Sequence, residues 1–241
     1  MFENKRALLF DIDGTLLDSI SVWNETDRRL YAALGGEYHR SCNQFREECL
    51  MRAAPGTDPY LFYCGELGKR FGSLLTPMQI MRLRADISAE LLRTTVSYKP
   101  GAPEFLRAAK DAGLLLALTS TTRRANLEIH RTNERLCAEA AFDDYFSLML
   151  AREDVSAGKP DKEIYVTALK MLDLTARECL VFEDSPAGIA AATAAGIDTA
   201  AICEPFYEAD ADAIREKVIA VFPDFYAVLD RFTSERKNGG A

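Results

Sequence analysis

The stretch ALLFDIDGT, residues 7–15, decides the fold. It begins with a four-residue apolar run at 7–10, which is typical of a buried strand. The pair Asp13 and Gly14 then predicts a tight loop, since Asp-Gly favours turns. We therefore expect this strand to deliver two aspartates, Asp11 and Asp13, to the loop at its carboxyl end.

The segment that follows this loop has a different pattern. Residues 20–95 show helical spacing with polar breaks and no convincing strand. The last helix of this segment is predicted over 77–94, with Thr76 as its N-cap and Pro77 at the first helical position. We interpret the segment as a separate helical insertion that ends before Pro100.

From residue 102 onward, apolar runs alternate with helical patterns. The predicted helices are 102–112, 123–138, 161–172 and 186–195, and the predicted strands are 114–118, 146–150, 179–182 and 197–202. Strands that are apolar throughout and alternate with helices indicate a parallel sheet covered on both faces.

The fold class predicted is therefore α/β, a doubly wound, Rossmann-like parallel sheet with an inserted all-helical domain. We expect the core to comprise residues 1–18 and 97–233 and the insertion to comprise residues 19–96. Residues 234–241 carry no apolar period, so we expect a flexible tail there.

Composition and charge exclude several classes of protein. The 241 residues are 48% hydrophobic and 27% charged, as in an ordinary globular protein with a real core. The net charge of -8 argues against a nucleic-acid partner, which would favour clustered Lys and Arg. No stretch approaches the roughly 18 apolar residues of a membrane span, and the start lacks a secretory cleavage pattern. We expect a cytoplasmic protein, a monomer or weak dimer, whose partner is a small molecule and not a membrane.

Acidic residues follow two of the predicted strands. Ligands of such sheets bind beyond the carboxyl ends of the strands, so Asp11 and Asp13 should meet Glu183 and Asp184. Like charges about 4 Å apart repel by roughly 4 kcal/mol per pair at an effective dielectric near 20. Such a cluster must raise its pKa values or bind a cation, and oxygen ligands beside a phosphate favour Mg²⁺. The sequence therefore predicts a magnesium site and a phosphate guest.

Groups suited to binding that phosphate lie on two further loops. Ser120 and Thr121 belong to a run of hydroxyl residues where the predicted helix 123–138 begins, and the amides of a helix start attract anions. Arg123 directly follows this run and is a candidate to bind substrate, as is Thr121. Lys159, in Gly-Lys-Pro, offers a compact positive charge to a phosphoryl oxygen.

Four ordered motifs together resemble the haloacid dehalogenase superfamily. They are D-x-D-G-T at 11–15, the hydroxyl at Ser120, the lysine of G-K-P at Lys159 and E-D-S-x-x-G at 183–188. The insertion after the first motif resembles the C1 cap of the branch that contains phosphoglycolate phosphatase and β-phosphoglucomutase.

The resemblance implies a chemistry for these residues. Asp11 would attack phosphorus and form an aspartyl phosphate, which water would then hydrolyse. Asp13 would protonate the leaving oxygen and later activate the water. Ser120 and Lys159 would bind the phosphoryl oxygens.

The resemblance also implies a metal ion. Mg²⁺ would be held by the carboxylates of Asp11 and Asp184 and the backbone carbonyl of Asp13, with Glu183 behind it or linked through a water. The implied activity is the Mg²⁺-dependent hydrolysis of a small phosphorylated metabolite, a sugar phosphate or a phospho-acid.

Two alternatives stay open from the sequence. One is a phosphomutase of the β-phosphoglucomutase type, although Trp23 stands where that enzyme carries a histidine, twelve residues after the nucleophile. The other is a non-catalytic protein that binds a phosphorylated ligand, against which the intact Asp13 and Lys159 argue. Dehalogenases lack the second aspartate, and the imine-forming lysine of phosphonatases has only Arg52 as its nearest counterpart here, so both of these activities are disfavoured.

Overall fold

The computed structural model describes residues 1–39, 41–54 and 56–238, and the chain divides into two compact units. The first unit, called the core, combines Met1–Ser19 with Ser97–Ala241. The second, called the cap, is Ile20–Val96. Within the described ranges, no helix is both long and apolar enough to cross a membrane.

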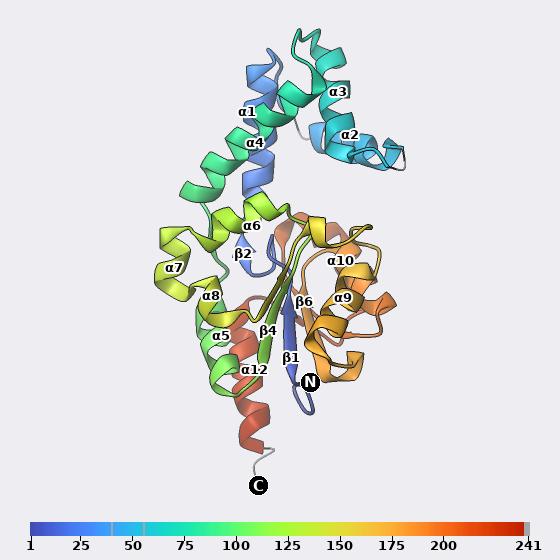
Figure 1. Cartoon of the computed structure of the whole chain (residues 1–241). Coiled ribbons are helices and arrows are strands. Elements are labelled where there is room, and N and C mark those ends of the chain that lie inside the picture. Colours follow the sequence, from blue (N-terminus) through green and yellow to red (C-terminus); the bar gives the residue numbers. More distant parts are fainter. Residues whose placement is uncertain (40, 55, 239–241) are drawn as a thin grey trace. The chain divides into compact units, whose positions relative to one another are not determined.

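The core is built on a six-stranded parallel sheet (Figure 1). In spatial order the strands are β5 Leu148–Leu150, β4 Leu115–Thr119, β1 Ala7–Phe10, β6 Cys179–Glu183, β7 Asp198–Ile202 and β8 Ala220–Phe222. Phe10 of β1 pairs in register with Leu118 on one side and Phe182 on the other. The predicted α/β core is confirmed, because strands covered on both faces read as continuous apolar runs.

Helices cover both faces of this sheet. They are α5 Ala102–Asp111, α6 Arg124–Arg131, α7 Glu134–Ala140, α8 Phe142–Tyr145, α9 Glu163–Leu172, α10 Pro186–Ala194, α11 Ala211–Arg215 and α12 Phe225–Asn238. Figure 1 shows α5 and α12 on one side of the strands and α9 and α10 on the other. On the first side Phe105 of α5 stacks on Phe225 of α12, with ring centroids 5.7 Å apart. These rings also contact Phe10 and Phe182 of the sheet, so aromatic packing fixes both helices to the two central strands.

The single helix predicted over 123–138 is wrong, because the structure has two helices there. The break falls at Thr132 and Asn133, and the Asn133 side chain accepts hydrogen bonds from the backbone amides of Arg135 and Leu136. Asparagine favours such a capping position over the interior of a helix.

The segment from Ser234, for which a flexible tail is predicted, is helical over the described residues, since α12 continues to Asn238. Within this segment the Glu235 carboxylate accepts hydrogen bonds from the terminal amine of Met1 at 3.0 Å and from the Phe2 amide at 2.9 Å. This contact spans the whole chain, so no local pattern announces it. Residues 239–241 of the predicted tail lie outside the described residues.

Several segments of the core escaped the sequence prediction, among them strand β8 and the helices α11 and α12. Two further ones are very short. Strands β2 Leu17–Asp18 and β3 Ser97–Tyr98 pair antiparallel, with Leu17 opposite Tyr98. Two residues are too few to show a period of alternation. The pair joins the chain segments that lead into and out of the cap.

Over its described residues the cap consists of four helices, and the sequence had predicted a helical insertion without their number. They are α1 Ile20–Ala33, α2 Ser41–Arg52, α3 Pro59–Phe71 and α4 Pro77–Thr94. The start of α4 has the expected cap: Thr76 Oγ1 accepts from the Gln79 amide, and Gln79 Oε1 accepts from the Thr76 amide. Leu30, Tyr63 and Leu67 belong to its buried apolar core.

A charged cluster lies inside this bundle. Asp27 of α1 is only 1% exposed and accepts hydrogen bonds from Arg46 of α2 and Arg84 of α4, at 2.5 and 2.9 Å. The Arg84 guanidinium also lies 4.6 Å from the centre of the Tyr60 ring. One carboxylate therefore ties three helices of the cap together.

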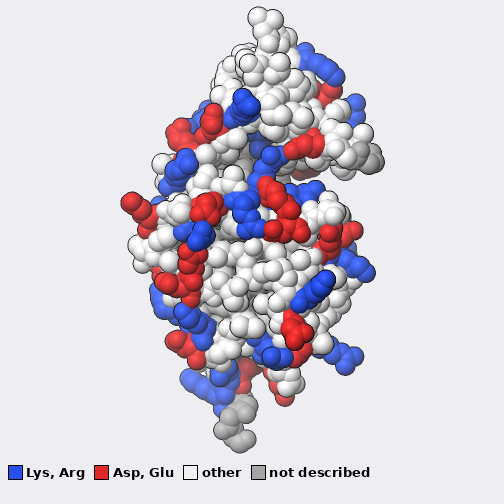
Figure 2. Space-filling view, viewed as in Figure 1, with Lys and Arg blue, Asp and Glu red and all other residues white. Residues whose placement is uncertain are grey.

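Charges on the surface are mixed in sign. Figure 2 shows Lys and Arg side chains interspersed with Asp and Glu over the face in view. Such interspersed charges suit a well-solvated surface.

Replacing the central carboxylate of the buried cluster should destabilise the cap. In Asp27→Asn, Arg46 and Arg84 lose their counter-charge, and an uncompensated buried charge costs about 3–5 kcal/mol. Urea unfolding followed by the fluorescence of Trp23, the one tryptophan of the chain, measures this loss. The control Glu25→Gln removes a surface partner of Arg28 and should cost less than about 1 kcal/mol. Equal unfolding midpoints for the two variants would contradict the prediction.

Candidate active site

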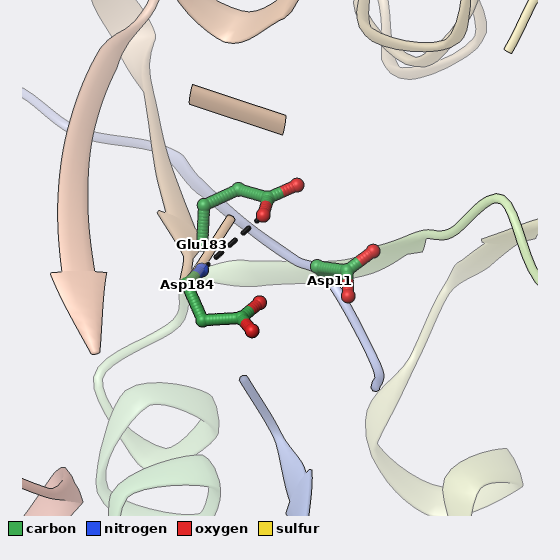
Figure 3. A group of neighbouring side chains, drawn as sticks. All are labelled: Asp11, Glu183 and Asp184. Atoms are coloured by element: carbon green, nitrogen blue, oxygen red, sulfur yellow. Dashed lines mark hydrogen bonds between the residues drawn. The ribbon is translucent and has the colours of Figure 1, made fainter. Parts of the chain in front are cut away.

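Three carboxylates meet at the carboxyl ends of the two central strands. Asp11 directly follows β1, Glu183 is the last residue of β6, and Asp184 comes next (Figure 3). Each offers an oxygen atom, and these oxygens lie within 4.8 Å of one another. Because β1 and β6 are paired in register, residues distant in sequence come side by side here.

The loop after β1 folds back toward β6. Gly14 has a φ of 86°, a left-handed conformation that glycine adopts without strain, and its amide donates to the Leu17 carbonyl at 2.9 Å. Thr15, next along the loop, donates its hydroxyl to Asp184 Oδ1 at 2.8 Å. This hydrogen bond joins the D-x-D-G-T motif to the E-D-S-x-x-G motif.

Asp13 differs from the other three acidic residues. Its Oδ1 accepts a hydrogen bond from the Ser19 hydroxyl at 2.6 Å, and its side chain is partly exposed. Four carboxylates were expected in one pocket, but among the described residues the candidate metal-binding group contains only three. In the structure the Asp13 carboxylate is held by the Ser19 hydroxyl instead.

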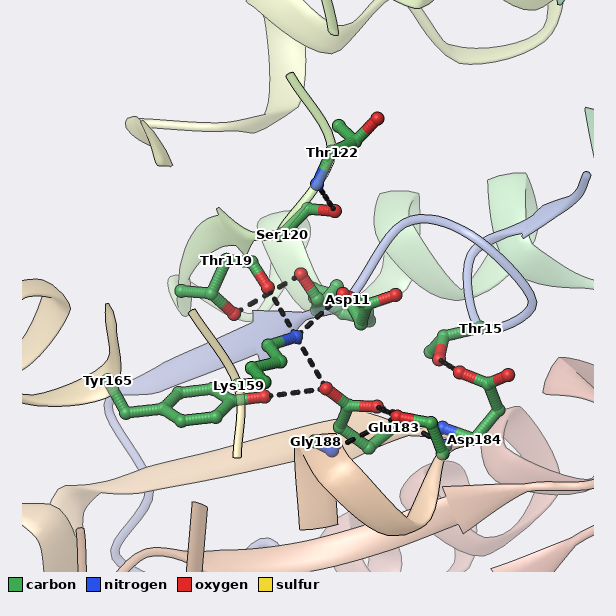
Figure 4. Close-up of polar contacts among 12 residues, drawn as sticks. Asp11, Thr15, Thr119, Ser120, Thr122, Lys159, Tyr165, Glu183, Asp184 and Gly188 are labelled. Carbon is green, nitrogen blue, oxygen red and sulfur yellow. Dashed lines mark hydrogen bonds and ion pairs between the residues drawn. The ribbon is translucent and has the colours of Figure 1, made fainter. Parts of the chain in front are cut away.

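Lys159 stands at the centre of the site (Figure 4). Its ammonium donates to Asp11 Oδ1 at 2.6 Å, to the Thr119 carbonyl at 2.8 Å and to Glu183 Oε1 at 2.5 Å. Its side chain is 4% exposed. The single positive charge therefore serves two carboxylates, and all three of its N–H groups have partners.

Glu183 is held on both carboxylate oxygens. Oε1 accepts from Lys159 and from the Tyr165 hydroxyl at 2.9 Å, while Oε2 accepts from the Asp184 amide at 3.2 Å and the Ser185 hydroxyl at 3.2 Å. The carboxylate also lies against Gly188, where an added Cβ would stand 1.9 Å from Oε1. A side chain at this position would force the Glu183 carboxylate to move.

Ser185 caps the N-terminus of α10. Its hydroxyl oxygen accepts from the Gly188 amide at 3.0 Å at the start of α10. Since the same hydroxyl donates to Glu183, the helix start and the acidic pair are built as one unit.

The hydroxyl loop lies beside Lys159. Thr119 supplies the carbonyl described above, and Ser120, which is buried, accepts from the Thr122 amide at 3.1 Å. Thr121 is exposed, and Arg123 is the partly exposed N-cap residue of α6. Ser120 therefore directly follows the residue whose carbonyl binds Lys159, and Thr121 and Arg123 are more exposed than Ser120.

The site has an excess of buried negative charge. Burial raises the pKa of Asp11 to about 7; Lys159 opposes this rise, while Glu183 adds to it. Burial, followed by the charge of Glu183, raises the pKa of Asp184 well above its usual range. Burial alone would lower the pKa of Lys159, but the charges of Asp11 and Glu183 raise it well above its usual value. The lysine therefore stays protonated, and its single positive charge does not balance the charge of the carboxylates.

A hard cation fits the residues that are present. Asp184 Oδ2 is buried, and among the described residues it has no hydrogen-bond partner. A buried carboxylate oxygen without a donor is costly, and a cation would remove that cost. With one lysine against three carboxylates, the donor set suits an oxygen-seeking divalent ion such as Mg²⁺.

Sequence reasoning assigned no role to three residues that contact the site. Tyr165 and Ser19 contact Glu183 and Asp13, and Thr15, although part of the first motif, was given no contact with Asp184. No spacing rule connects these pairs, because each depends on how strands and loops meet in space. For Tyr165 the one available signal was a hydroxyl on the helix that follows Lys159.

Comparisons with known proteins identify the family of the chain. A family model described as haloacid dehalogenase-like hydrolase matches residues 5–196. Protein CbbY of Rhodobacter capsulatus is 32% identical over 195 residues, which cover 80% of this chain and 82% of that protein. A phosphorylated carbohydrates phosphatase of Thermotoga maritima is 30% identical over 195 residues, with coverage of 80% and 82%.

A solved structure extends the comparison to three dimensions. The crystal structure of CbbY from Rhodobacter sphaeroides in complex with phosphate matches with a TM-score of 0.69 and 25% identity, covering 92% of this chain and 95% of that one. The resemblance predicted from the four ordered motifs is thus confirmed. On the sequence, the fold and the clustered motifs together, the chain belongs to the haloacid dehalogenase-like hydrolase family.

Proposed function

We propose that this hydrolase removes the phosphate group from a small phosphorylated metabolite, a sugar phosphate or a phospho-acid, by way of a phosphorylated Asp11. The observation that carries the proposal is the Lys159 ammonium, which joins Asp11 and Glu183 inside a group of three buried carboxylates. The name of the Thermotoga relative, a phosphorylated carbohydrates phosphatase, supports the substrate class.

Asp11 is the nucleophile in this proposal. Lys159 holds Oδ1, so the other carboxylate oxygen attacks phosphorus as the bond from phosphorus to the ester oxygen breaks. Asp13 gives its proton to the leaving oxygen, then takes one from the water that attacks the aspartyl phosphate. Inorganic phosphate leaves, and both carboxyl groups return to their starting forms.

The phosphoryl oxygens gather negative charge during both steps. Lys159, which contacts Asp11, and the Ser120 hydroxyl, next along the chain from the Thr119 carbonyl that Lys159 binds, are the donors suited to them (Figure 4). Donors fixed in a buried site stabilise such charge more than they would in water. Thr121 and Arg123, on the same loop, are proposed to contact the rest of the substrate.

Magnesium completes the charge balance. The residues that would hold it are Asp11 and Asp184, through their carboxylates, and Asp13, through its backbone carbonyl. When bound, Mg²⁺ supplies Lewis-acid chemistry that lets an anionic nucleophile meet an anionic phosphate. The partnerless Asp184 Oδ2 supports this assignment.

Removal of the nucleophile tests the proposal directly. With Mg²⁺ and an aryl phosphate, Asp11→Asn should lower kcat by roughly 10³-fold or more, because no aspartyl phosphate can form. Release of inorganic phosphate is the measurement. The control Asp198→Asn, which alters a carboxylate paired with Lys5 at the opposite end of the sheet, should leave kcat within about twofold. Full activity of Asp11→Asn would refute the mechanism.

Removal of metal is a separate test. Dialysis against a chelator should abolish phosphate release, and added Mg²⁺ should restore it, because the carboxylate charges are otherwise uncompensated. In Asp184→Asn the Mg²⁺ concentration for half-maximal rate should rise roughly tenfold or more. Activity that survives the chelator unchanged would rule out a metal requirement.

The space beside Gly188 gives a steric prediction. In Gly188→Ala the new Cβ would overlap the Glu183 carboxylate, which would have to move and would no longer position the Lys159 side chain, so kcat should fall by roughly 100-fold. The matched control is Gly65→Ala in the cap, where the nearest atom to the new Cβ is 3.5 Å away. Kinetics of both variants on the aryl phosphate compare them. If they lose kcat to the same extent, the steric explanation is wrong.

A further inference from the structure

Tyr165 lies beneath the catalytic lysine, in the first turn of α9, and is fully buried. Its hydroxyl donates to Glu183 Oε1 at 2.9 Å, the same oxygen that accepts from Lys159 at 2.5 Å. The Lys159 ammonium also lies 5.3 Å from the centre of the Tyr165 ring. One carboxylate oxygen is therefore shared by a phenol and an ammonium.

The ammonium has no donor to spare. Its three N–H groups are taken by Asp11 Oδ1, the Thr119 carbonyl and Glu183 Oε1. A phosphoryl oxygen can be bound only if one of these contacts is released. If the ammonium released Asp11, the lysine would lose its contact with the nucleophile. If it released the Thr119 carbonyl, that carbonyl would lose the hydrogen bond from the ammonium.

The contact with Glu183 is the one that can be given up at low cost. When the ammonium turns from Oε1 to a phosphoryl oxygen, the Tyr165 hydroxyl still donates to Oε1. The opposite oxygen, Oε2, keeps its hydrogen bonds to Asp184 and Ser185. The fully buried carboxylate then stays satisfied and in place.

We propose that Tyr165 is a positioning residue for the reaction: by holding Glu183 Oε1, its hydroxyl frees the Lys159 ammonium to move onto the transferring phosphoryl group. This inference rests on the proposed phosphatase function. Tyr165 touches neither substrate nor the reacting atoms and acts through Glu183 and Lys159.

The proposed role of Tyr165 predicts a different effect of Tyr165→Phe from the effect that a purely structural role would predict. In the resting protein Glu183 Oε1 retains Lys159 when the phenol is lost, so the folded state should be little affected. In the transition state the lysine has moved away and Oε1 would be left without a donor. The cost of Tyr165→Phe should therefore be seen in kcat and scarcely in stability.

The experiment compares Tyr165→Phe with the wild-type chain on an aryl phosphate with Mg²⁺. An unsatisfied buried acceptor corresponds to a loss of about tenfold in kcat, with KM changed less than about twofold. In the Lys159→Met background the same substitution should cause no further loss, because there is no ammonium to release. The control Tyr38→Phe, which removes a phenol bonded to Asn43 in the cap, should leave kcat unchanged.

The outcomes separate the two proposals. If the wild-type chain releases no phosphate from any substrate, the proposed function fails. If it does, and Tyr165→Phe keeps full kcat or loses the same factor with and without Lys159, the role of Tyr165 is wrong. A second variant, Tyr165→Met, also lacks the donor but fills the space flexibly. It should show the same loss of kcat, and a folded Tyr165→Met with full kcat would equally overturn the inference.

Discussion

The ion pair network of Lys159 is the interaction on which the site depends. A single buried ammonium joins Asp11, at the end of β1, to Glu183, at the end of β6. Without it, three carboxylates with oxygens within 4.8 Å would face one another in a buried place, which carboxylates tolerate only when protonated or bound to a cation. The lysine lowers this cost without removing it, and the remaining negative charge makes the site receptive to a divalent ion.

The parallel sheet makes this concentration of charge possible. Because β1 and β6 are neighbours in register, their last residues emerge at the same edge, and each contributes acidic groups to one small volume. The apolar interior of the strands and the stacked Phe10 and Phe182 rings support the edge from below. Gly188, which has no Cβ, leaves room for the Glu183 carboxylate. The packing of the core thus holds these like charges close together although they repel one another.

Much of the fold and the site could be predicted from local patterns. Five strands of the core sheet, β1, β4, β5, β6 and β7, were recognised because burial on both faces leaves a continuous apolar run, and α4 because Thr76 and Pro77 mark its start. The break at Asn133 depends on a local cap that was overlooked, and the helical residues after Ser234 were also missed. In the latter case the stabilising contact joins Glu235 to Met1, at the other end of the chain. A pattern in a short window cannot register a partner so distant in sequence.

The sequence by itself determined which chemical groups the site contains and at which strand ends they stand, because residue type and strand position are local properties. It established the carboxylates, the lysine and the order of the motifs, and it placed a helical insertion after the first of them. Only the tertiary structure decided how these groups share their hydrogen bonds. In the folded chain Asp13 accepts a hydrogen bond from Ser19, and Glu183 accepts hydrogen bonds from both Lys159 and Tyr165. Asp184 Oδ2 has no donor among the described residues. Hydrogen bonds act over about 3 Å between atoms, and that distance is set by the packing of elements and not by separation along the chain.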